Sequence, residues 1–269
     1  MTHTIIGFIG AGNMASSLAG GMINKGLAAR NIWMSDPSQE QLNAVATEHG
    51  VQVSTDNALL ASKADVLVLA VKPQVMEAVC RSLAPQLATR RPLIVSIAAG
   101  VTLANLKAWL GDLPMVRCMP NTPALVQAGA TGLYADESVS AEHRDISQQI
   151  LSSVGLTAWF DSEAALDAVT AVSGSGPAYF FLLMESMIAA GQQLGLSADA
   201  ARQLTLQTAL GAAQLAITSD VGPEVLRQRV TSPGGTTAAA LDVFESRAFR
   251  QIVADALAAA AQRSQELAG

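Results

Sequence analysis

The chain has 269 residues, of which 50% are hydrophobic, 14% charged and 4% aromatic, and its formal net charge is −6. This length can bury one large or two modest cores, and a negative chain with few aromatic residues and no basic cluster is not expected to bind nucleic acid. The two cysteines, Cys80 and Cys118, lie in apolar runs without metal-ligand spacing, which predicts a reducing cytoplasm and no metal site.

Strands and helices alternate in the first part of the chain. The run Asp65–Val71, D-V-L-V-L-A-V, is typical of a strand buried on both faces of a parallel sheet. The other predicted strands are Thr4–Gly10, Ile32–Ser35, Val51–Ser54, Pro92–Ala98 and Met115–Met119, with edge strands at Thr131–Tyr134 and Thr157–Phe160. The predicted helices are 13–25, after a turn through Ala11 and Gly12, and Gln39–Glu48, Pro73–Leu83, Thr102–Leu110 and Ala141–Ser153. This alternation predicts a doubly wound α/β fold with a mostly parallel sheet and helices on both faces.

From Ser162 onward the pattern changes to alanine, leucine and glutamine at helical spacing, with no convincing strand. The predicted helices are Ala164–Ser173, Pro177–Leu194, Ala198–Thr218, Pro223–Val230, Thr237–Ser246 and Phe249–Leu267. We therefore place a boundary between residues 161 and 162, with an α/β domain (1–161) before it and an all-helical domain (162–269) after it.

No membrane segment is expected, because the longest apolar stretch, residues 178–190, is too short to span a bilayer and is interrupted by Glu185. The chain enters its first predicted strand at Thr4, which leaves no room for a signal peptide. The low charged fraction predicts an oligomer that buries apolar helix faces.

The segment Gly10-Ala11-Gly12-Asn13-Met14-Ala15 matches G-x-G-x-x-A and stands between the first strand and the first helix. Gly10 permits the tight turn, Gly12 lets the backbone approach a pyrophosphate, and Ala15 lets the helix pack closely on the strand. This pattern predicts a dinucleotide site. A nicotinamide cofactor is its commonest occupant, and a mononucleotide or a flavin is the alternative.

The end of the second strand is expected to face the adenosine ribose, and it carries Ser35-Asp36-Pro37-Ser38. Asp36 could pair with a free ribose hydroxyl and repel a 2′-phosphate, which favours NAD. Alternatively, Pro37 could turn Asp36 away and leave Ser35 and Ser38 to donate to a phosphate. No arginine nearby favours NADP strongly, so the residues leave NADH and NADPH both open.

A second candidate site is Thr231-Ser232-Pro233-Gly234-Gly235-Thr236-Thr237, directly before an apolar helical stripe. Two glycines after a proline stop a helix and leave backbone N–H groups exposed. Thr236 and Thr237 stand where a helix N-cap is expected. Free N–H donors, a helix dipole and threonine hydroxyls suit this junction to a carboxylate, and an ordinary capped turn is the alternative.

Several motifs are spread over the whole chain. They are Gly7–Ala15 (G-F-I-G-A-G-N-M-A), Ala70–Pro73 (A-V-K-P), Val95–Thr102 (V-S-I-A-A-G-V-T), Arg117–Pro123 (R-C-M-P-N-T-P), Val172–Tyr179 (V-S-G-S-G-P-A-Y) and Ser232–Thr237 (S-P-G-G-T-T). Together they resemble the pyrroline-5-carboxylate reductase family. The resemblance implies reduction of Δ1-pyrroline-5-carboxylate to L-proline with NADPH or NADH, as the last step of proline biosynthesis. It also implies a dinucleotide-binding Rossmann domain (1–161), a helical dimerisation and substrate-binding domain (162–269), and dimers that often assemble into decamers.

The motifs and the resemblance together define the predicted site residues. The predicted cofactor contacts are Gly10, Gly12, Asn13, Met14, Ser35, Asp36, Asn57, Ala70, Val71, Lys72, Pro73, Ala98, Ala99 and Asn121. The predicted substrate contacts are Ser175, Ser232, Gly234, Gly235, Thr236 and Thr237. The resemblance places the Thr237 hydroxyl near the ring nitrogen, where it could orient the imine or relay a proton. Asp36 departs from the serine- or threonine-containing turn of NADPH-preferring members.

Some of these residues have a structural alternative. Asn57 and Ser175 could be helix caps, Asn121 a turn residue, and Lys72 either a solvated lysine or the partner of Asp220 or Glu224 in a neighbouring chain. The three histidines, His3, His49 and His143, lie outside every motif and are expected to be solvated.

Three other functions compete with the reductase. A β-hydroxyacid dehydrogenase needs a lysine on the helix after a G-x-x-G turn, and the helix after Gly176 reads P-A-Y-F-F-L-L-M-E-S without one. A reductase of another cyclic imine is harder to exclude. A non-catalytic dinucleotide sensor would not need the intact S-P-G-G-T-T segment.

Overall fold

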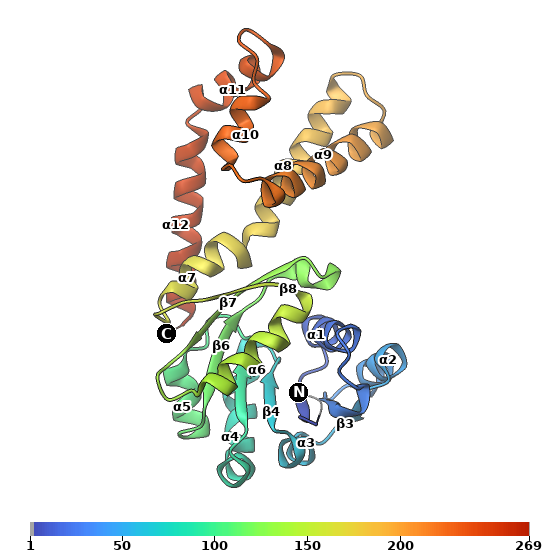
Figure 1. Cartoon of the computed structure of the whole chain (residues 1–269), viewed down its shortest axis with the longest axis vertical. Helices are drawn as coiled ribbons and strands as arrows, with labels where there is room; N and C mark the ends of the chain where they lie inside the picture. The colour runs from blue at the N-terminus through green and yellow to red at the C-terminus, as the bar shows by residue number, and fades with distance from the viewer. Residues whose placement is uncertain (1–2, 269) are drawn as a thin grey trace. The chain divides into compact units, whose positions relative to one another are not determined.

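The computed structural model describes residues 3–268 and divides into two compact units, residues 1–175 with 260–269, and residues 176–259 (Figure 1). The boundary predicted between residues 161 and 162 lies just after the last strand, whereas the compact units divide between Ser175 and Gly176. The difference arises because residues 162–175 and the end of the last helix pack on the sheet domain, although their sequence pattern is helical.

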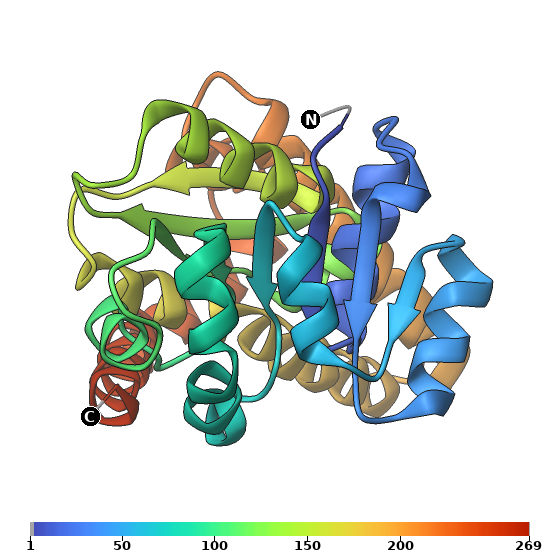
Figure 2. The same cartoon turned by 90° about the horizontal axis from the view of Figure 1, so that it is seen from below.

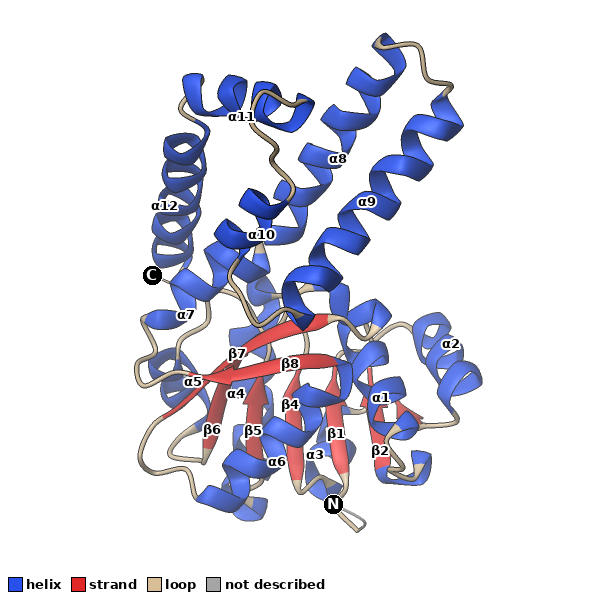
Figure 3. Cartoon of the chain, turned by 45° about the horizontal axis from the view of Figure 1, so that its top comes forward, coloured by secondary structure: helices blue, strands red, loops and turns tan. Residues whose placement is uncertain are grey.

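The first unit is built on one eight-stranded sheet in the order β3-β2-β1-β4-β5-β6-β7-β8 (Figure 3). Its strands are β1 (Ile6–Ile9), β2 (Ile32–Ser35), β3 (Gln52–Ser54), β4 (Val66–Leu69), β5 (Leu93–Ser96), β6 (Met115–Met119), β7 (Gly129–Ala135) and β8 (Gly155–Trp159). Its helices are α1 (Asn13–Asn24), α2 (Gln39–His49), α3 (Asn57–Lys63), α4 (Pro73–Arg90), α5 (Leu103–Leu110), α6 (Ala141–Leu151) and α7 (Ala165–Val169). Short 3-10 turns stand at η1 (Ala29–Asn31), η2 (Thr122–Val126) and η3 (Ser152–Val154), and a π-helical turn, η4 (Thr170–Gly174), follows α7.

All neighbouring strands in this sheet are parallel except β6 and β7, which are antiparallel. Helices α1, α2 and α6 contribute side chains to a core on one face, and α3, α4 and α5 contribute to a core on the other. Figure 2 shows the strands with helices on both sides. Residues alternate between the two cores along a strand, so that Val66 and Val68 face one core and Leu67 and Leu69 the other. The predicted doubly wound, mostly parallel fold is confirmed.

Three predictions about the elements are corrected. Helix α3 was not predicted, because seven residues behind an Asp56 cap are too few to show a clear period. The helix α4 continues past Leu83 to Arg90, because Pro85 lies on its exposed side while Leu83 and Leu87 stay buried. The strand predicted at Thr131–Tyr134 is not an edge strand, since β7 pairs with both β6 and β8.

Burial in this unit makes both cysteines unreactive. Cys80 of α4 and Cys118 of β6 are free thiols in different cores. Burial raises the pKa of Cys80 to about 12 and also raises the pKa of Cys118, so both stay protonated at neutral pH.

The second unit consists of α8 (Gly176–Gln193), α9 (Ala198–Thr218), α10 (Pro223–Arg229), α11 (Thr236–Ser246) and α12 (Phe249–Leu267) up to Ala259. Helices α8 and α9 run side by side as a hairpin (Figures 1 and 3). Large apolar side chains of this unit are exposed, among them Phe180 (65%), Leu194 (87%) and Ile217 (82%). Because a surface this apolar is unusual for a monomer, it indicates a unit that packs against another protein chain. No helix among residues 3–268 is both long enough and apolar enough to cross a membrane.

An ion pair between Lys107 and Asp136 connects α5 to the segment after β7, and its strength can be tested by pH. The hydrogen bond from Lys107, helped by Ser138, holds the pKa of Asp136 below its ordinary value of 3.8. A lowered folded-state pKa stabilises the fold above the unfolded-state pKa, and this stability is lost as the pH falls through the folded-state pKa.

We therefore expect Asp136→Asn to lower the free energy of unfolding at pH 7 by about 1 kcal/mol or less, since both side chains are partly exposed and screened. Urea unfolding at several pH values would measure this, and the difference from the original protein should shrink below about pH 4, where the unfolded chain takes up its proton. A difference that stays constant from pH 7 to pH 3 would rule out the ion pair as its source.

Candidate functional site

The turn between β1 and α1 has the shape that a dinucleotide pyrophosphate requires. Gly10 has a φ of +102°, and a methyl group there would lie 2.7 Å from the carbonyl oxygen of Ala70. At Gly12, by contrast, a methyl group would meet nothing within 4 Å. Gly12 is the N-cap of α1 without a side-chain cap bond, and the first turn of α1 carries no acidic residue. The free N–H groups of this turn and its open space at Gly12 fit a bound phosphate group.

These two glycines give a matched test of the cofactor site. Gly12→Ala should leave the free energy of unfolding within about 1 kcal/mol, because its φ of −72° suits alanine and its methyl group has space. The same methyl group should weaken nicotinamide-cofactor binding about tenfold or more, since it fills the approach to the pyrophosphate. Gly10→Ala should instead destabilise the fold by at least about 1–2 kcal/mol. Titration calorimetry and urea unfolding measure the two effects, and full cofactor affinity in Gly12→Ala would speak against the site.

The loop after β2 lies against this turn. The carboxylate of Asp36 accepts hydrogen bonds from the N–H of Ala11 (3.1 Å) and the N–H of Ser38 (2.9 Å). Of the two alternatives for this loop, the one in which Pro37 turns Asp36 away from the glycine turn is therefore wrong. The Ser35 side chain is fully buried and its hydroxyl donates to Phe8 O (3.4 Å), which removes it from any surface that a ligand could reach.

The predicted residues after β4 also lie at the carboxyl edge of the sheet. Ala70 and Val71 are half-buried, and the N–H of Ala70 donates to Ile9 O (2.8 Å), which connects this segment to β1. Lys72 is the exposed N-cap of α4, and Pro73 is the first residue of that helix. Lys72 has no ion-pair partner among the described residues 3–268, which leaves its ammonium group free for a ligand.

Two further predictions are refined by local geometry. Asn57 is not a helix cap, because Asp56 caps α3 through the N–H groups of Ala58 and Leu59. In the segment after β5, Ala98 is buried in the core, whereas Ala99 is exposed and is the one of the two that a ligand could touch.

Asn121 joins two of the sequence motifs. Its amide nitrogen donates to the carbonyl and the hydroxyl of Ser173 (both 3.2 Å), and its oxygen accepts from the N–H of Ala130 (2.8 Å). The amide of Asn121 therefore holds M-P-N-T-P against V-S-G-S-G. The packing is close here, since a methyl group on Gly174 would lie 2.5 Å from Met119 Cε and would displace the end of that side chain. Ser175 is half-buried at the end of this packed segment, and its N–H donates to Thr170 O (2.8 Å).

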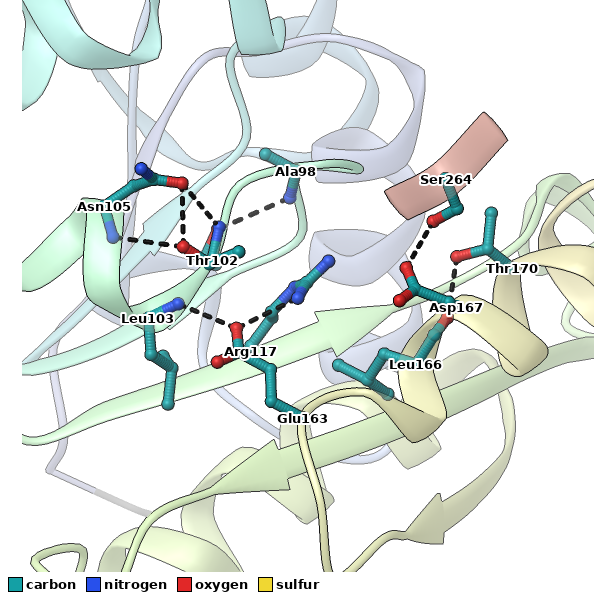
Figure 4. Close-up of polar contacts among 11 residues, drawn as sticks. Ala98, Thr102, Leu103, Asn105, Arg117, Glu163, Leu166, Asp167, Thr170 and Ser264 are labelled. Carbon is teal, nitrogen blue, oxygen red and sulfur yellow. Dashed lines mark hydrogen bonds and ion pairs between the residues drawn. The ribbon is translucent and has the colours of Figure 1, made fainter. Parts of the chain in front are cut away.

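A partly buried ion pair that was not predicted from the sequence supports the segment after β5 (Figure 4). One oxygen of Glu163 accepts from Arg117 Nη1 (2.9 Å) and from the N–H of Leu103 at the start of α5 (2.7 Å). The Arg117 side chain is only 7% exposed. Nearby, the hydroxyl of Ser264 donates to Asp167 (2.7 Å), which fixes the end of α12 to α7. No local pattern reveals these pairs, because their members are 46 to 97 residues apart.

The S-P-G-G-T-T segment lies in the second unit and leads into α11. Gly234 has a φ of +67°, in the left-handed region that favours glycine. The N-cap of α11 is Gly235, and Thr236 and Thr237 are the first two helical residues, so the prediction that the threonines are caps is wrong. The N–H of Gly235 donates to Ser232 O (3.0 Å), whereas the first hydrogen bond along α11 runs from the N–H of Ala239 to Gly235 O (3.1 Å). The N–H groups of Thr236, Thr237 and Ala238 are therefore left without a partner in the helix.

The start of α11 is electrostatically suited to an anion. Its N-cap makes no side-chain hydrogen bond, and its first turn carries no acidic residue. The helix dipole adds partial positive charge at this point. Gly234 and Thr236 are exposed, while Thr237 is half-buried.

The structure corrects the expectation that His49 is solvated. His49 Nε2 lies 2.7 Å from the Ser16 hydroxyl, and its side chain is 14% exposed. A methyl group on Gly20 would lie 2.9 Å from the His49 ring, so α1 and α2 pack closely here. His3 is exposed, and His143 is half-buried. Among residues 3–268 no group of three or more His, Cys, Asp or Glu side chains could hold a metal ion.

Comparisons with known proteins match both the sheet-containing part of the chain and its helical part. Residues 163–267 match the family model "Pyrroline-5-carboxylate reductase dimerisation", and residues 5–100 match the model "NADP oxidoreductase coenzyme F420-dependent". A curated pyrroline-5-carboxylate reductase of Pseudomonas aeruginosa is 58% identical over 269 residues, covering 100% of this chain and 98% of the relative. A second one, from Haemophilus influenzae, is 42% identical and covers 99% and 98%.

Solved structures give the same result. A pyrroline-5-carboxylate reductase of Coxiella burnetii superposes with a TM-score of 0.95 at 43% identity, covering 99% of both chains. The Plasmodium falciparum pyrroline carboxylate reductase with NADP bound superposes with a TM-score of 0.89 at 32% identity, covering 100% of both chains. These full-length matches extend over the glycine turn, the packed M-P-N-T-P and V-S-G-S-G segments and the start of α11. The chain therefore belongs to the pyrroline-5-carboxylate reductase family.

Proposed function

We propose that this chain reduces Δ1-pyrroline-5-carboxylate to L-proline with NADPH or NADH, the last step of proline biosynthesis. The observation that carries the proposal is the full-length 58% identity to a curated reductase of this name, which spans both candidate anion sites. The start of α1 suits the cofactor pyrophosphate, and the start of α11 suits the substrate carboxylate.

The cofactor would be held along the carboxyl edge of the sheet. A reduced nicotinamide supplies a hydride when it is bound. The N–H groups at the start of α1, around Asn13 and Met14, would hold the pyrophosphate, with Gly12 leaving space for it. Asp36 and Asn57 would lie toward the adenosine, and the segments around Lys72 and Ala99 would flank the nicotinamide side.

The substrate carboxylate would be held by the N–H groups of Thr236, Thr237 and Ala238. Gly235 contributes shape rather than a donor, because its own N–H already bonds to Ser232 O. The exposed hydroxyl of Ser232 is a further donor at the same turn. Several fixed donors at a helix start orient a carboxylate without a buried cation.

Proton transfer at the substrate nitrogen would fall to Thr237. A cyclic imine becomes more electrophilic when it is protonated, so the enzyme needs orientation more than a strong base. The Thr237 hydroxyl both donates and accepts hydrogen bonds, which lets it orient the ring nitrogen or relay a proton to it.

We also propose that the chain self-associates as a dimer through its second unit and acts in the cytoplasm. The exposed apolar side chains of α8 and α9 and the match to a dimerisation model support the dimer. Two free, buried cysteines support a reducing compartment. Light scattering of the purified protein would give the dimer mass or, if dimers assemble further, the decamer mass.

One assay tests the reaction. Oxidation of NADPH and of NADH is followed with pyrroline-5-carboxylate, and in parallel with pyrroline-2-carboxylate and piperideine-6-carboxylate. The proposal expects the highest kcat/KM with pyrroline-5-carboxylate. A higher value with another imine would reassign the substrate, and no oxidation with any of them would favour a non-catalytic dinucleotide sensor.

A further inference from the structure

The loop after β2 carries a carboxylate at the place where the two nicotinamide cofactors differ. In a doubly wound sheet the residue after β2 faces the adenosine ribose, which bears a free 2′-hydroxyl in NADH and a 2′-phosphate in NADPH. We infer that Asp36 makes this chain select NADH over NADPH. The inference rests on the proposed cofactor site at Gly10–Gly12 and goes beyond it by naming the preferred cofactor.

The contacts of Asp36 leave room for a ribose diol. A carboxylate has about four lone-pair positions. One oxygen of Asp36 accepts from the N–H of Ala11 and the other from the N–H of Ser38, which uses two of these positions. Each oxygen keeps one position for a ribose hydroxyl. The same two bonds tie the ribose loop to the glycine turn, so the carboxylate is fixed in place before any ligand binds.

The neutral donors that could hold a 2′-phosphate are mostly engaged. The hydroxyl of Ser35 is buried against Phe8 O. The backbone N–H of Ser38 donates to Asp36, and its hydroxyl oxygen caps α2 by accepting from the N–H of Gln41 (3.3 Å). The first turn of α2 already carries an acid, Glu40, at its positive end. A phosphate would therefore find the hydroxyl proton of Ser38 and the first N–H groups of α2, at Gln39 and Glu40, but also two carboxylates.

The charges of the surrounding elements also disfavour a 2′-phosphate. From residue 31 to residue 62, which spans β2, α2, β3 and most of α3, the chain has no lysine or arginine. Its acids there are Asp36, Glu40, Glu48 and Asp56, of which Glu48 stands at the far end of α2, beyond the Debye length of about 8 Å at physiological salt. A 2′-phosphate would bring about two further negative charges into this region.

The basic residues that flank this region lie elsewhere. Arg30 lies in the 3-10 turn before β2, and the length of that strand, about 10 Å, separates it from the carboxyl end. Lys63 precedes β4, at the amino edge of the sheet, and lies over the Trp33 ring at 5.0 Å. Lys72 follows β4, which is separated from β2 by β1, so it is displaced by two strand spacings, about 10 Å. No described cation therefore balances a 2′-phosphate beside Asp36.

Binding of two cofactor fragments tests the inference without relying on turnover. The probes are ADP-ribose and 2′-phospho-ADP-ribose, titrated by calorimetry into the full-length protein. We expect ADP-ribose to bind at least about tenfold more tightly, a difference of about 1.4 kcal/mol. Asp36→Asn keeps the size of the side chain and one acceptor oxygen but removes the charge. It should reduce the ratio of the two dissociation constants, 2′-phospho-ADP-ribose to ADP-ribose, about tenfold. The kcat/KM ratio of NADH to NADPH should change in parallel.

Glu48→Gln is the matched control, because it removes the same charge at the far end of α2, about 13 Å along the helix. It should leave the ratio unchanged, and circular dichroism should show all three proteins folded. Equal or tighter binding of the 2′-phosphorylated probe by the original protein would overturn the inference, as would an unchanged ratio in Asp36→Asn. If neither probe binds, the proposed cofactor site itself is wrong, an outcome distinct from a reversed preference.

Discussion

Replacing Thr237 by alanine is expected to lower kcat/KM for pyrroline-5-carboxylate by roughly 10-fold to 10⁴-fold, because a positioned proton-transfer group contributes up to about 10⁴-fold. The variant keeps the backbone N–H groups that would hold the carboxylate, so the loss should be larger in kcat than in KM. Stability should change little, because Thr237 is a helical residue of α11 and its N-cap is Gly235. Steady-state kinetics and a urea unfolding curve on the same preparation measure both effects.

The neighbouring threonine provides the control for this experiment. Thr236→Ala removes an exposed hydroxyl from the same helical turn and should retain near-normal kinetics. Thr237→Ser keeps a hydroxyl and should recover most of the activity. Unchanged kinetics in Thr237→Ala would remove this side chain from the mechanism, and equal losses in both alanine variants would indicate a general effect on α11.

The second large effect is expected on stability. Glu163→Ala should lower the free energy of unfolding of the first unit by about 3–5 kcal/mol, because it leaves the Arg117 guanidinium buried without its partner. It also removes the acceptor for the N–H of Leu103 at the start of α5 (Figure 4). The fluorescence of Trp33, Trp109 and Trp159, all in the first unit, can follow the unfolding transition in urea.

Asp161→Ala is a suitable control, since it removes an exposed acid two residues away. It should change stability by no more than about 0.5 kcal/mol. Glu163→Gln keeps neutral acceptor and donor atoms and should fall between the other two variants. A Glu163→Ala protein as stable as the Asp161→Ala protein would show that Arg117 finds another partner or water.

The strands and helices that were predicted correctly are those whose residue pattern is visible within the element itself. Buried strands are short, mostly apolar runs, so β2 and β6 were predicted with their observed bounds, Ile32–Ser35 and Met115–Met119. Helix α9 was likewise predicted with its observed bounds, Ala198–Thr218, because a long helix shows many turns of the same period. Helix α3 is too short for its period to be read, and the position of β7 inside the sheet depends on a partner strand rather than on its own residues.

In the candidate site, too, some features could be predicted from the local sequence and others could not. The glycine turn and the S-P-G-G-T-T segment could be predicted, because glycines with φ of +102° and +67° carry their conformational requirement in their own identity. Their ligands remain proposals. The roles of individual side chains beside these turns could not be predicted, as for Ser35, which is buried, and for Gly235, whose N–H is already bonded.

By itself, the amino-acid sequence determined the alternating α/β half, the helical half and the two glycine-rich turns, because periodicity and backbone freedom are local properties of a chain. Only the tertiary structure decided which way Asp36 faces, that the Ser35 hydroxyl is buried against Phe8 and which acid neutralises Arg117. These outcomes depend on atoms from distant segments that become neighbours only when the chain folds.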